Sequence, residues 1–395
     1  MFQLSKFILP LTFLTLSLPL EVEAQSRRTT AERSEQAVGT DTVVKKKSAI
    51  NRIIDYFDSS NKKELTTHPD FSVLGGPHYS SEKGLGLGLV VAGIYSTEPS
   101  DTVLPASNIS LVGDIATKSF YMVGLRGAHV FPSNSRRINY SVSFESFATY
   151  FWGIGYAAGN NDGNKTKYRQ LKFDISADME WRLAKGLYLG PAVRFLHVNA
   201  KDLRNVEIWS SYPHAVSSIA AGGRLQYDLR DNLTAPTTGL LLEVTQLFYP
   251  RFIGNGDRSF SSTEIAANKY VRAWKNSVVA VRAHALFTYG HTPWCAMAYI
   301  GGNNMRGYYE GRYRNKNEFD LTVELRQHLF RRSGVVGWLG VASVFPKFKE
   351  IRFRELLPEC GIGYRWEFKK NSNVRIDFGI GKHSTGFMFG LNEAF

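Results

Sequence analysis

The sequence predicts an all-β protein, a transmembrane antiparallel β-barrel of sixteen strands. Its hydrophobicity alternates with a period of two over most of the chain, and many alternating segments are long enough to cross a bilayer. In 172–183, for example, Phe173, Ile175 and Trp181 alternate with charged or polar residues. Such alternation in many segments, separated by turns rich in Gly, Asn, Asp and Pro, is typical of antiparallel sheets.

A soluble β-sandwich is the competing architecture. The polar faces of several strands carry charges of both signs, which are costly to bury in a dry core but can line the wet lumen of a barrel whose apolar face contacts lipid. Large aromatic residues near strand ends also favour the barrel, because membrane barrels carry aromatic girdles at both interfaces. These residues are Tyr150, Trp152, Trp181, Trp209, Tyr212, Trp274 and Trp338.

The number of predicted strands is even, as in single-chain bacterial barrels. The first strand is the weakest, because Gly75, Gly76 and Pro77 lower strand stability. The predicted strands are 71–80, 84–97, 107–116, 118–131, 137–152, 168–183, 185–199, 216–230, 238–249, 262–275, 277–290, 318–331, 334–345, 357–370, 373–382 and 385–395.

The first 24 residues have the pattern of a secretory signal peptide. A charged start, an apolar run from Phe7 to Leu20 and a small residue at Ala24 predict cleavage there. The alternative is a membrane anchor. The run is shorter than the ~20 apolar residues of a spanning helix, and Pro10 and Pro19 interrupt it.

Residues 25–70 are expected to form a disordered periplasmic segment with a short amphipathic helix at about 43–58, followed by the barrel at 71–395. The helix is predicted from apolar residues at helical spacing, namely Ile50, Ile53, Ile54 and Phe57. Either it leads into the barrel, or it packs on something. Residues 43–63 are therefore a possible docking site for a periplasmic or lipoprotein partner.

The net charge indicates which partners to expect, and the cysteine content limits the possible disulfides. The formal net charge is +13. An exported chain is a poor partner for nucleic acid, so outer-membrane lipid and lipopolysaccharide phosphates are the expected anions. Cys295 and Cys360 are too few for a disulfide framework. They form either one bridge or two free thiols.

The stretch 300–320 reads IGGNNMRGYYEGRYRNKNEFD, a long basic and aromatic loop between two predicted strands. Its centre resembles the loop-tip motif in the sixth extracellular loop of the BamA/TamA superfamily, the bacterial surface antigen family of outer-membrane assembly and translocation barrels. Two further resemblances follow the family order, at 227–244 and at the end of the chain (374–381 and 387–395). The loop residues that match are Gly301, Gly302, Met305, Arg306, Gly307 and Tyr308.

The resemblance implies that the loop folds into the lumen and that Arg306 meets acidic residues on the inner wall. Asp377 is the first candidate partner, followed by Glu324 and Asp320. The chain departs from the family at Gly340 and Ala342, where members carry an Asp and a Gly.

The resemblance also implies a function: helping proteins insert into or cross the outer membrane of a Gram-negative bacterium. Family members carry periplasmic polypeptide-transport-associated domains before the barrel. Residues 25–70 are too few for one such domain, so clients would arrive directly or through a partner. A structural or partner-docking barrel and a plugged pore remain alternatives.

The final predicted strand ends in an aromatic residue, as outer-membrane barrels read by the barrel-assembly machinery typically do. The expected signal comprises Phe387, Phe389, Leu391 and Phe395. A chain that ends in Phe by chance is the alternative.

No catalytic, metal-binding or cofactor-binding motif is found in the sequence, so an enzyme is not expected. His284 and His328 lie on polar strand faces and are expected to be lumen residues. An aromatic and basic group in the loop is either a ligand-binding patch or lumen packing. Its members are Tyr308, Tyr309, Tyr313, Arg306, Arg312 and Arg314.

Overall fold

The computed structural model describes residues 66–80, 83–101, 104–369 and 372–395. The chain divides into two units, 1–63 and 64–395, and all the described residues belong to the second. The expected signal peptide and the expected helix at about 43–58 lie outside the described residues.

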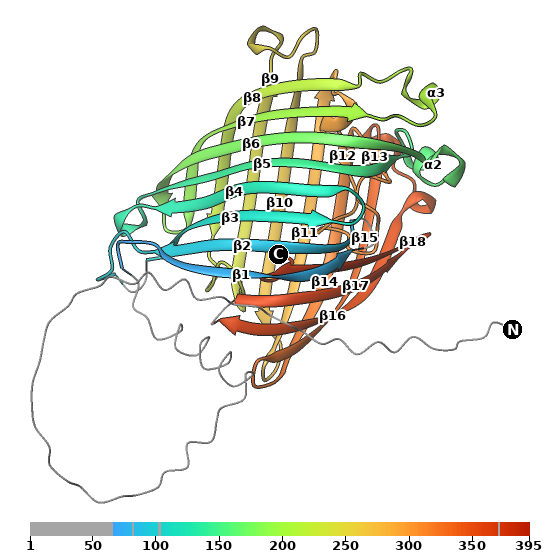
Figure 1. Ribbon diagram of the computed structural model, residues 1–395. Coiled ribbons are helices and arrows are strands. Elements are labelled where there is room, and N and C mark those ends of the chain that lie inside the picture. Colours follow the sequence, from blue (N-terminus) through green and yellow to red (C-terminus); the bar gives the residue numbers. More distant parts are fainter. Residues whose placement is uncertain (1–65, 81–82, 102–103, 370–371) are drawn as a thin grey trace, which may run out of the picture. The chain divides into compact units, whose positions relative to one another are not determined.

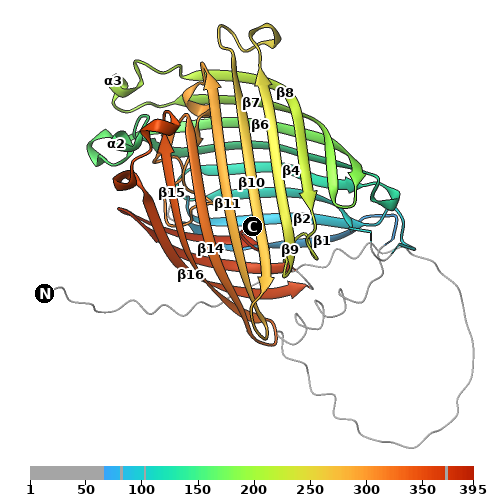
Figure 2. The ribbon, with the colours of Figure 1, turned by 180° about the vertical axis from the view of Figure 1, so that it is seen from behind.

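Sixteen antiparallel strands form one sheet, in which each strand pairs with the next along the chain (Figures 1 and 2). The predicted all-β barrel fold is confirmed. The strands are β1 (Asp70–Ser80), β2 (Gly84–Tyr95), β3 (Ser107–Ala116), β4 (Phe120–Val130), β5 (Arg136–Phe151), β6 (Thr166–Ala184), β7 (Leu187–Lys201), β8 (Ala215–Asp228), β9 (Gly239–Tyr249), β10 (Phe260–Arg272), β11 (Ser277–Gly290), β14 (Asn317–Phe330), β15 (Ser333–Phe345), β16 (Leu357–Lys369), β17 (Ser372–Gly381) and β18 (Ser384–Leu391).

The loops differ between the two ends of the barrel. Long connections, such as 152–165, 202–214 and 291–316, all lie at the end where β1 finishes, whereas turns at the other end are as short as 185–186. The loops contain the hairpin β12 (Ala298–Tyr299) with β13 (Arg314–Asn315), and short helices. The helices are α2 (Tyr156–Gly159), α3 (Val206–Trp209), η1 (Pro132–Asn134), η2 (Asp162–Asn164), η3 (Arg251–Ile253), η4 (Trp294–Ala296), η5 (Phe348–Glu350) and η6 (Phe353–Glu355).

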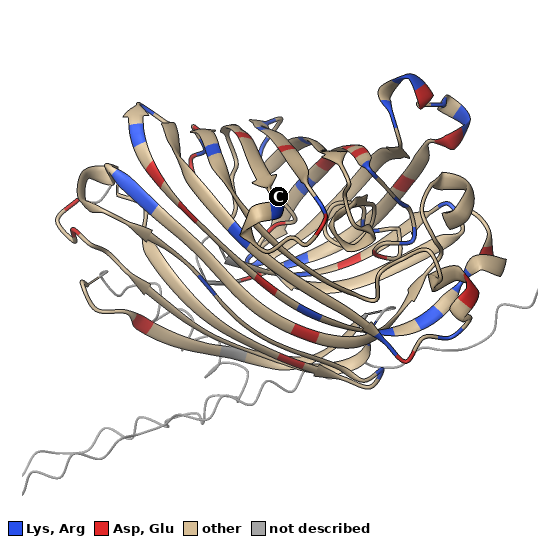
Figure 3. Cartoon of the chain, turned by 90° about the horizontal axis from the view of Figure 1, so that it is seen from above, with Lys and Arg blue, Asp and Glu red and all other residues tan. Residues whose placement is uncertain are grey.

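The two faces of the sheet differ in polarity as the alternation predicts. On β14, Leu321, Val323 and Leu325 are exposed on the outer face, whereas Asp320 and Glu324 are buried on the inner face. Successive residues of a strand point to opposite faces of the sheet, so one strand can present an apolar outer face and a charged inner face. Figure 3 shows basic and acidic residues at intervals along the strands. The outer face therefore suits lipid, and the inner face holds the charges.

The expected aromatic girdle is only partly present. Trp181 and Trp274 are exposed, but Trp152, Trp209 and Trp338 are buried. Loop residues cover Trp152 and Trp209, and Trp338 lies on the inner face of β15 beneath Arg306. Trp209 in α3, for instance, packs on Phe151 with ring centroids 4.7 Å apart. For these three tryptophans the girdle interpretation was wrong.

No helix among the described residues is long and apolar enough to cross a membrane. Cys295 and Cys360 are both free thiols. Cys295 lies in η4 at the loop end, while Cys360 is exposed on the outer face of β16. Of the two alternatives, the structure therefore contains two free thiols and not a disulfide between them.

We expect Val323→Arg to destabilise the barrel in lipid vesicles by about 2–4 kcal/mol, because it places a charge near the bilayer midplane. Val323 is 43% exposed and lies midway along the outer face of β14. Denaturant unfolding in vesicles measures the change.

Leu329→Arg is the matched control, because Leu329 is 48% exposed and lies near the end of β14, where the cost falls to about 0–1 kcal/mol. Equal destabilisation by the two variants would contradict a lipid-facing outer surface.

Candidate functional site

The loop between β11 and β14 (291–316) folds into the barrel. After η4, the two arms of the loop pair as the β12–β13 hairpin, with Tyr299 opposite Arg314. Gly301 and Gly302 then turn the chain at φ +119° and +67°, in the left-handed region that favours glycine. Residues 305–308, here called the loop tip, are buried, with Met305 0% and Arg306 1% exposed.

Arg306 lies between two carboxylates from different strands. Its Nη1 donates to Asp377 Oδ2 at 3.0 Å, and its Nη2 donates to Glu324 Oε2 at 2.5 Å. The guanidinium also stacks over the Trp338 ring, 3.6 Å from the ring centroid. Of the three candidate partners, the structure thus brings Asp377 on β17 and Glu324 on β14 to the loop arginine.

Asp320, the third candidate, lies elsewhere. Among the described residues, its partners are His284 on β11, with 3.1 Å between Nδ1 and Oδ2, and Arg282, 3.8 Å away. Asp320 and Glu324 share the inner face of β14 but are four residues apart, which is about 13 Å along a strand. One guanidinium cannot reach both carboxylates, so the prediction that Asp320 is a partner of Arg306 was wrong.

Four further charged residues complete the network around Arg306, and the sequence analysis missed them. Asp377 also binds Arg365 at 2.6 Å and lies 3.6 Å from Arg375. Glu324 binds Arg326 at 2.7 Å. Glu393 accepts a hydrogen bond from Arg365 at 2.8 Å. Arg326, Arg365 and Arg375 alternate with apolar residues in the sequence. This pattern indicates a polar face for each, but it cannot give the register that brings them together.

Glu359 on β16 is another residue that was missed. It accepts a hydrogen bond from the backbone N–H of Gly307 at 2.7 Å and one from the Trp338 indole at 3.1 Å. Glu359 lies directly opposite Gly340. The missing side chain at Gly340 leaves room, since a Cβ there would lie 2.9 Å from Glu359 Cγ. The acidic group absent from β15 is thus supplied by the next strand.

The loop backbone approaches the last two strands so closely that side chains would not fit between them. A Cβ at Gly379 on β17 would lie 2.7 Å from the Gly307 nitrogen. A Cβ at Gly386 on β18 would overlap the Arg306 carbonyl oxygen, and one at Gly307 would lie 2.6 Å from the Ile380 carbonyl carbon. Glycine is therefore required on both sides of this contact.

Tyr308 fixes the same end of the loop. Its hydroxyl donates to the Pro358 carbonyl at 2.6 Å and accepts from the Lys382 N–H at 2.9 Å. Burial raises the pKa of Tyr308 well above its usual value, so the hydroxyl stays protonated as a donor.

The aromatic and basic residues of the loop favour lumen packing over a ligand patch. All but Tyr309 are buried. Arg312 donates to the carbonyls of Gly159 and His383 at 2.9 and 3.0 Å, and Arg314 donates to that of Trp294 at 2.8 Å. These arginines satisfy backbone carbonyls at the loop end of the barrel.

The end of the chain leaves the sheet after Leu391. Asn392, with φ +62°, turns the backbone away from β18. Phe395 then lies inside the barrel, with its ring beside Tyr270 (centroids 6.5 Å apart) and its carbonyl oxygen 2.9 Å from Arg326 Nη2. Phe387, Phe389 and Leu391 belong to β18, whereas Phe395 lies beyond its end, so the four residues of the expected assembly signal do not all lie on one strand.

The turn motif at 227–244 forms a self-contained connection between β8 and β9. Arg230 makes two hydrogen bonds to Asp228, at 2.9 and 3.0 Å. Asp231 accepts from the backbone N–H groups of Thr237 and Thr238 at 2.9 and 3.1 Å. Burial acts to raise the pKa of Asp231, but the hydrogen bonds outweigh it and hold the pKa below its usual value.

These features match a known family. The model of the Omp85 superfamily domain matches residues 128–354, more than half of the chain. The chain belongs to the Omp85 superfamily. This confirms, at superfamily level, the family predicted from the loop and turn motifs.

Solved structures also resemble this Omp85 barrel. One is BamA from Haemophilus ducreyi lacking POTRA domains 1-3, with a TM-score of 0.54 and 12% identity over 82% of this chain and 70% of that chain. Another is CdiB from Escherichia coli, with a TM-score of 0.52 and 13% identity over 82% of this chain and 60% of that chain. Identities this low establish a shared fold alone. No curated protein matches the sequence.

We expect Arg306→Ala to release the loop tip and to destabilise the barrel by about 3–5 kcal/mol, because it leaves Asp377 and Glu324 buried without this partner. Limited proteolysis of the loop and heat-modifiable migration on gels are the measurements. Arg352→Ala, on a side chain that is 58% exposed, is the control and should change neither. A loop that stays protected in Arg306→Ala would refute this anchoring.

We expect Gly386→Ala to displace the loop tip from β18, because the new methyl group would overlap the Arg306 carbonyl. Gly337→Ala is the matched control, since a Cβ at Gly337 meets nothing within 4 Å. Proteolysis of the loop should accelerate at least several-fold in the first variant only. Equal rates in both would show that the contact with β18 does not hold the loop.

Proposed function

We propose that this Omp85 barrel assists the insertion or translocation of proteins at the outer membrane of a Gram-negative bacterium, at the seam between β1 and β18. One observation carries the proposal. The two strands lie side by side, and the rings of Tyr79 and Phe387 are 6.0 Å apart. Yet within the described part of the chain no backbone ladder joins these strands.

An unjoined seam matters in a membrane because lipid cannot satisfy backbone N–H and C=O groups. Such an edge can accept an extended strand from another chain by strand addition. The sequence keeps this seam weak from both sides. β18 has 8 residues, fewer than the ~9–11 of a full membrane strand, and β1 contains Gly75, Gly76 and Pro77.

The loop contacts support a role at the seam rather than in a pore. The loop tip fills part of the lumen and is bonded to β14, β16 and β17, while the Tyr309 N–H donates to Ser384 on β18 at 3.1 Å. A filled lumen disfavours a diffusion pore. The loop instead braces the strands on one side of the seam, so that opening it does not unravel the barrel.

The remaining assignments are part of the same proposal. Residues 1–24 are a signal peptide, and residues 43–63 provide a docking site for a periplasmic or lipoprotein partner. The barrel contacts lipid and lipopolysaccharide, and the barrel-assembly machinery handles it during its own biogenesis. A docking barrel without insertase activity is the alternative.

Locking the seam tests the proposal. The test variant carries Tyr79→Cys and Phe387→Cys in a Cys295→Ser, Cys360→Ser background, and a short reducible cross-linker joins the two new thiols. We expect the link to abolish the assembly or translocation of client proteins until it is reduced. The control is Val73→Cys with Val91→Cys, a pair already opposed in the β1–β2 ladder. Outer-membrane proteomics after depletion of the wild-type protein provides the readout.

Loss of many barrels under the locked variant supports general assembly, and loss of one client supports a dedicated translocon. Mass spectrometry verifies the cross-link between β1 and β18. If the levels of all outer-membrane proteins then stay unchanged, the proposal is refuted and the docking alternative is favoured.

A further inference from the structure

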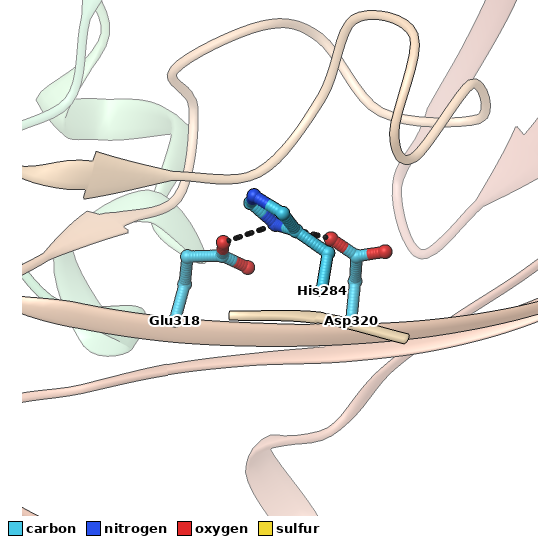
Figure 4. Close-up of side chains that lie close together, drawn as sticks. All are labelled: His284, Glu318 and Asp320. Atoms are coloured by element: carbon cyan, nitrogen blue, oxygen red, sulfur yellow. Dashed lines mark hydrogen bonds and ion pairs between the residues drawn. The ribbon is translucent and has the colours of Figure 1, made fainter. Parts of the chain in front are cut away.

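A second ionic cluster lies inside the barrel, away from Arg306. His284 on β11 is directly opposite Asp320 on β14. Glu318 precedes Asp320 by two residues, so it points to the same inner face. All three side chains are at least nine-tenths buried. Figure 4 shows the two carboxylates converging on the imidazole from β14.

The imidazole is contacted on both nitrogens. Nδ1 lies 2.8 Å from Glu318 Oε1 and 3.1 Å from Asp320 Oδ2. Nε2 lies 3.1 Å from Glu264 Oε1 on β10. Arg282 is the nearest further cation, with its Nη1 3.8 Å from Asp320 Oδ1. Three carboxylates therefore share one histidine and one arginine.

Two carboxylate oxygens in this cluster lack a donor. Among the described residues, Glu318 Oε2 and Asp320 Oδ1 are buried and have no hydrogen-bond partner. A buried acceptor without a partner costs about 1–3 kcal/mol, more when it is charged. The cluster thus contains two buried carboxylate oxygens that no protein donor satisfies within the described part of the chain.

We propose that His284 Nδ1, Glu318 and Asp320 bind one divalent transition-metal ion, Zn²⁺ by preference, inside the lumen. One imidazole nitrogen with carboxylate oxygens is a donor set that zinc accepts. In a tetrahedral site with bonds of ~2.0–2.1 Å, ligand atoms stand about 3.3 Å apart. The three donor atoms here all lie within 4.8 Å of one another. Small side-chain shifts are enough to form the site.

Glu264 supplies the outer partner that such a histidine needs. By accepting a hydrogen bond from Nε2–H, it fixes the tautomer whose Nδ1 lone pair faces the two carboxylates. The metal then replaces the proton that Nδ1 otherwise shares with Glu318 and Asp320. With Arg282, a divalent ion also balances the charge of the three carboxylates.

The site would link β11 and β14 through its ligands and β10 through Glu264. It lies at the start of β14, directly after the long loop 291–316. Its expected effect is on stability, because an ion that binds only the folded barrel shifts unfolding by mass action. The inference does not depend on the proposed function, and the seam plays no part in it.

Metal binding to the detergent-solubilised full-length protein is the test. After chelation and dialysis against Zn²⁺, we expect one tightly bound zinc per chain by elemental analysis, and a higher melting temperature with zinc than with chelator. Mg²⁺ at the same concentration should have no such effect.

Three variants sharpen the test. His284→Gln should weaken zinc binding at least 100-fold, and Glu264→Gln, which keeps all three ligands, should weaken it about 10–100-fold. His328→Gln, on a histidine exposed at the end of β14, should match the wild type. Heat-modifiable migration verifies folding, and Glu318→Gln replaces His284→Gln if that variant does not fold.

Less than about 0.2 zinc per wild-type chain, or equal zinc affinity in a folded His284→Gln or Glu318→Gln variant, would overturn the assignment. Binding that is lost equally in His328→Gln would also overturn it, because the ion would then be held by surface histidines.

Discussion

A buried guanidinium needs carboxylates within reach, and this requirement organises the interior of the barrel. Arg306 is almost wholly enclosed, where an unpaired charge would cost several kcal/mol. Asp377 and Glu324 supply the opposite charge, and each of them is in turn shared with other arginines from the wall. The result is a network in which positive and negative groups alternate. Removing one member leaves its neighbours with fewer opposite charges, so the loop, β14 and β17 act as one unit.

The loop that this network anchors also supports the strands at the seam. β18 is bonded to β17 on one side; on the other side its neighbour is β1, and among the residues that the structure describes no ladder joins the two. Support comes from inside, where the loop backbone presses on Gly379 and Gly386. A side chain at either position would push the loop away. Close backbone contact from the lumen can therefore hold the last strands in place while their outer edge stays available.

The period-two alternation predicts strand boundaries well, because lipid on one face and charge on the other enforce it. β14, for example, was expected at 318–331 and spans Asn317–Phe330. The alternation could not separate Asp320 from Glu324, since both share one face of that strand. Only the register across β11, β14 and β17 decides which acid meets Arg306 and which meets His284. The girdle prediction for Trp338 was wrong for another reason. Val336 and Trp338 are apolar yet point inward, so their polarity does not indicate which face they occupy.

The partners of Arg306 also order the steps by which the barrel is completed. Glu324 and Asp377 lie on β14 and β17, and those strands are separated in the sheet by β15 and β16. Their carboxylates come within reach of one guanidinium only when these four strands have paired and curved. Before that, burying the loop tip would place a charge in a nonpolar setting without a partner. The loop can thus be anchored only after its wall exists. Its protection from protease therefore reports that β14 to β17 have paired.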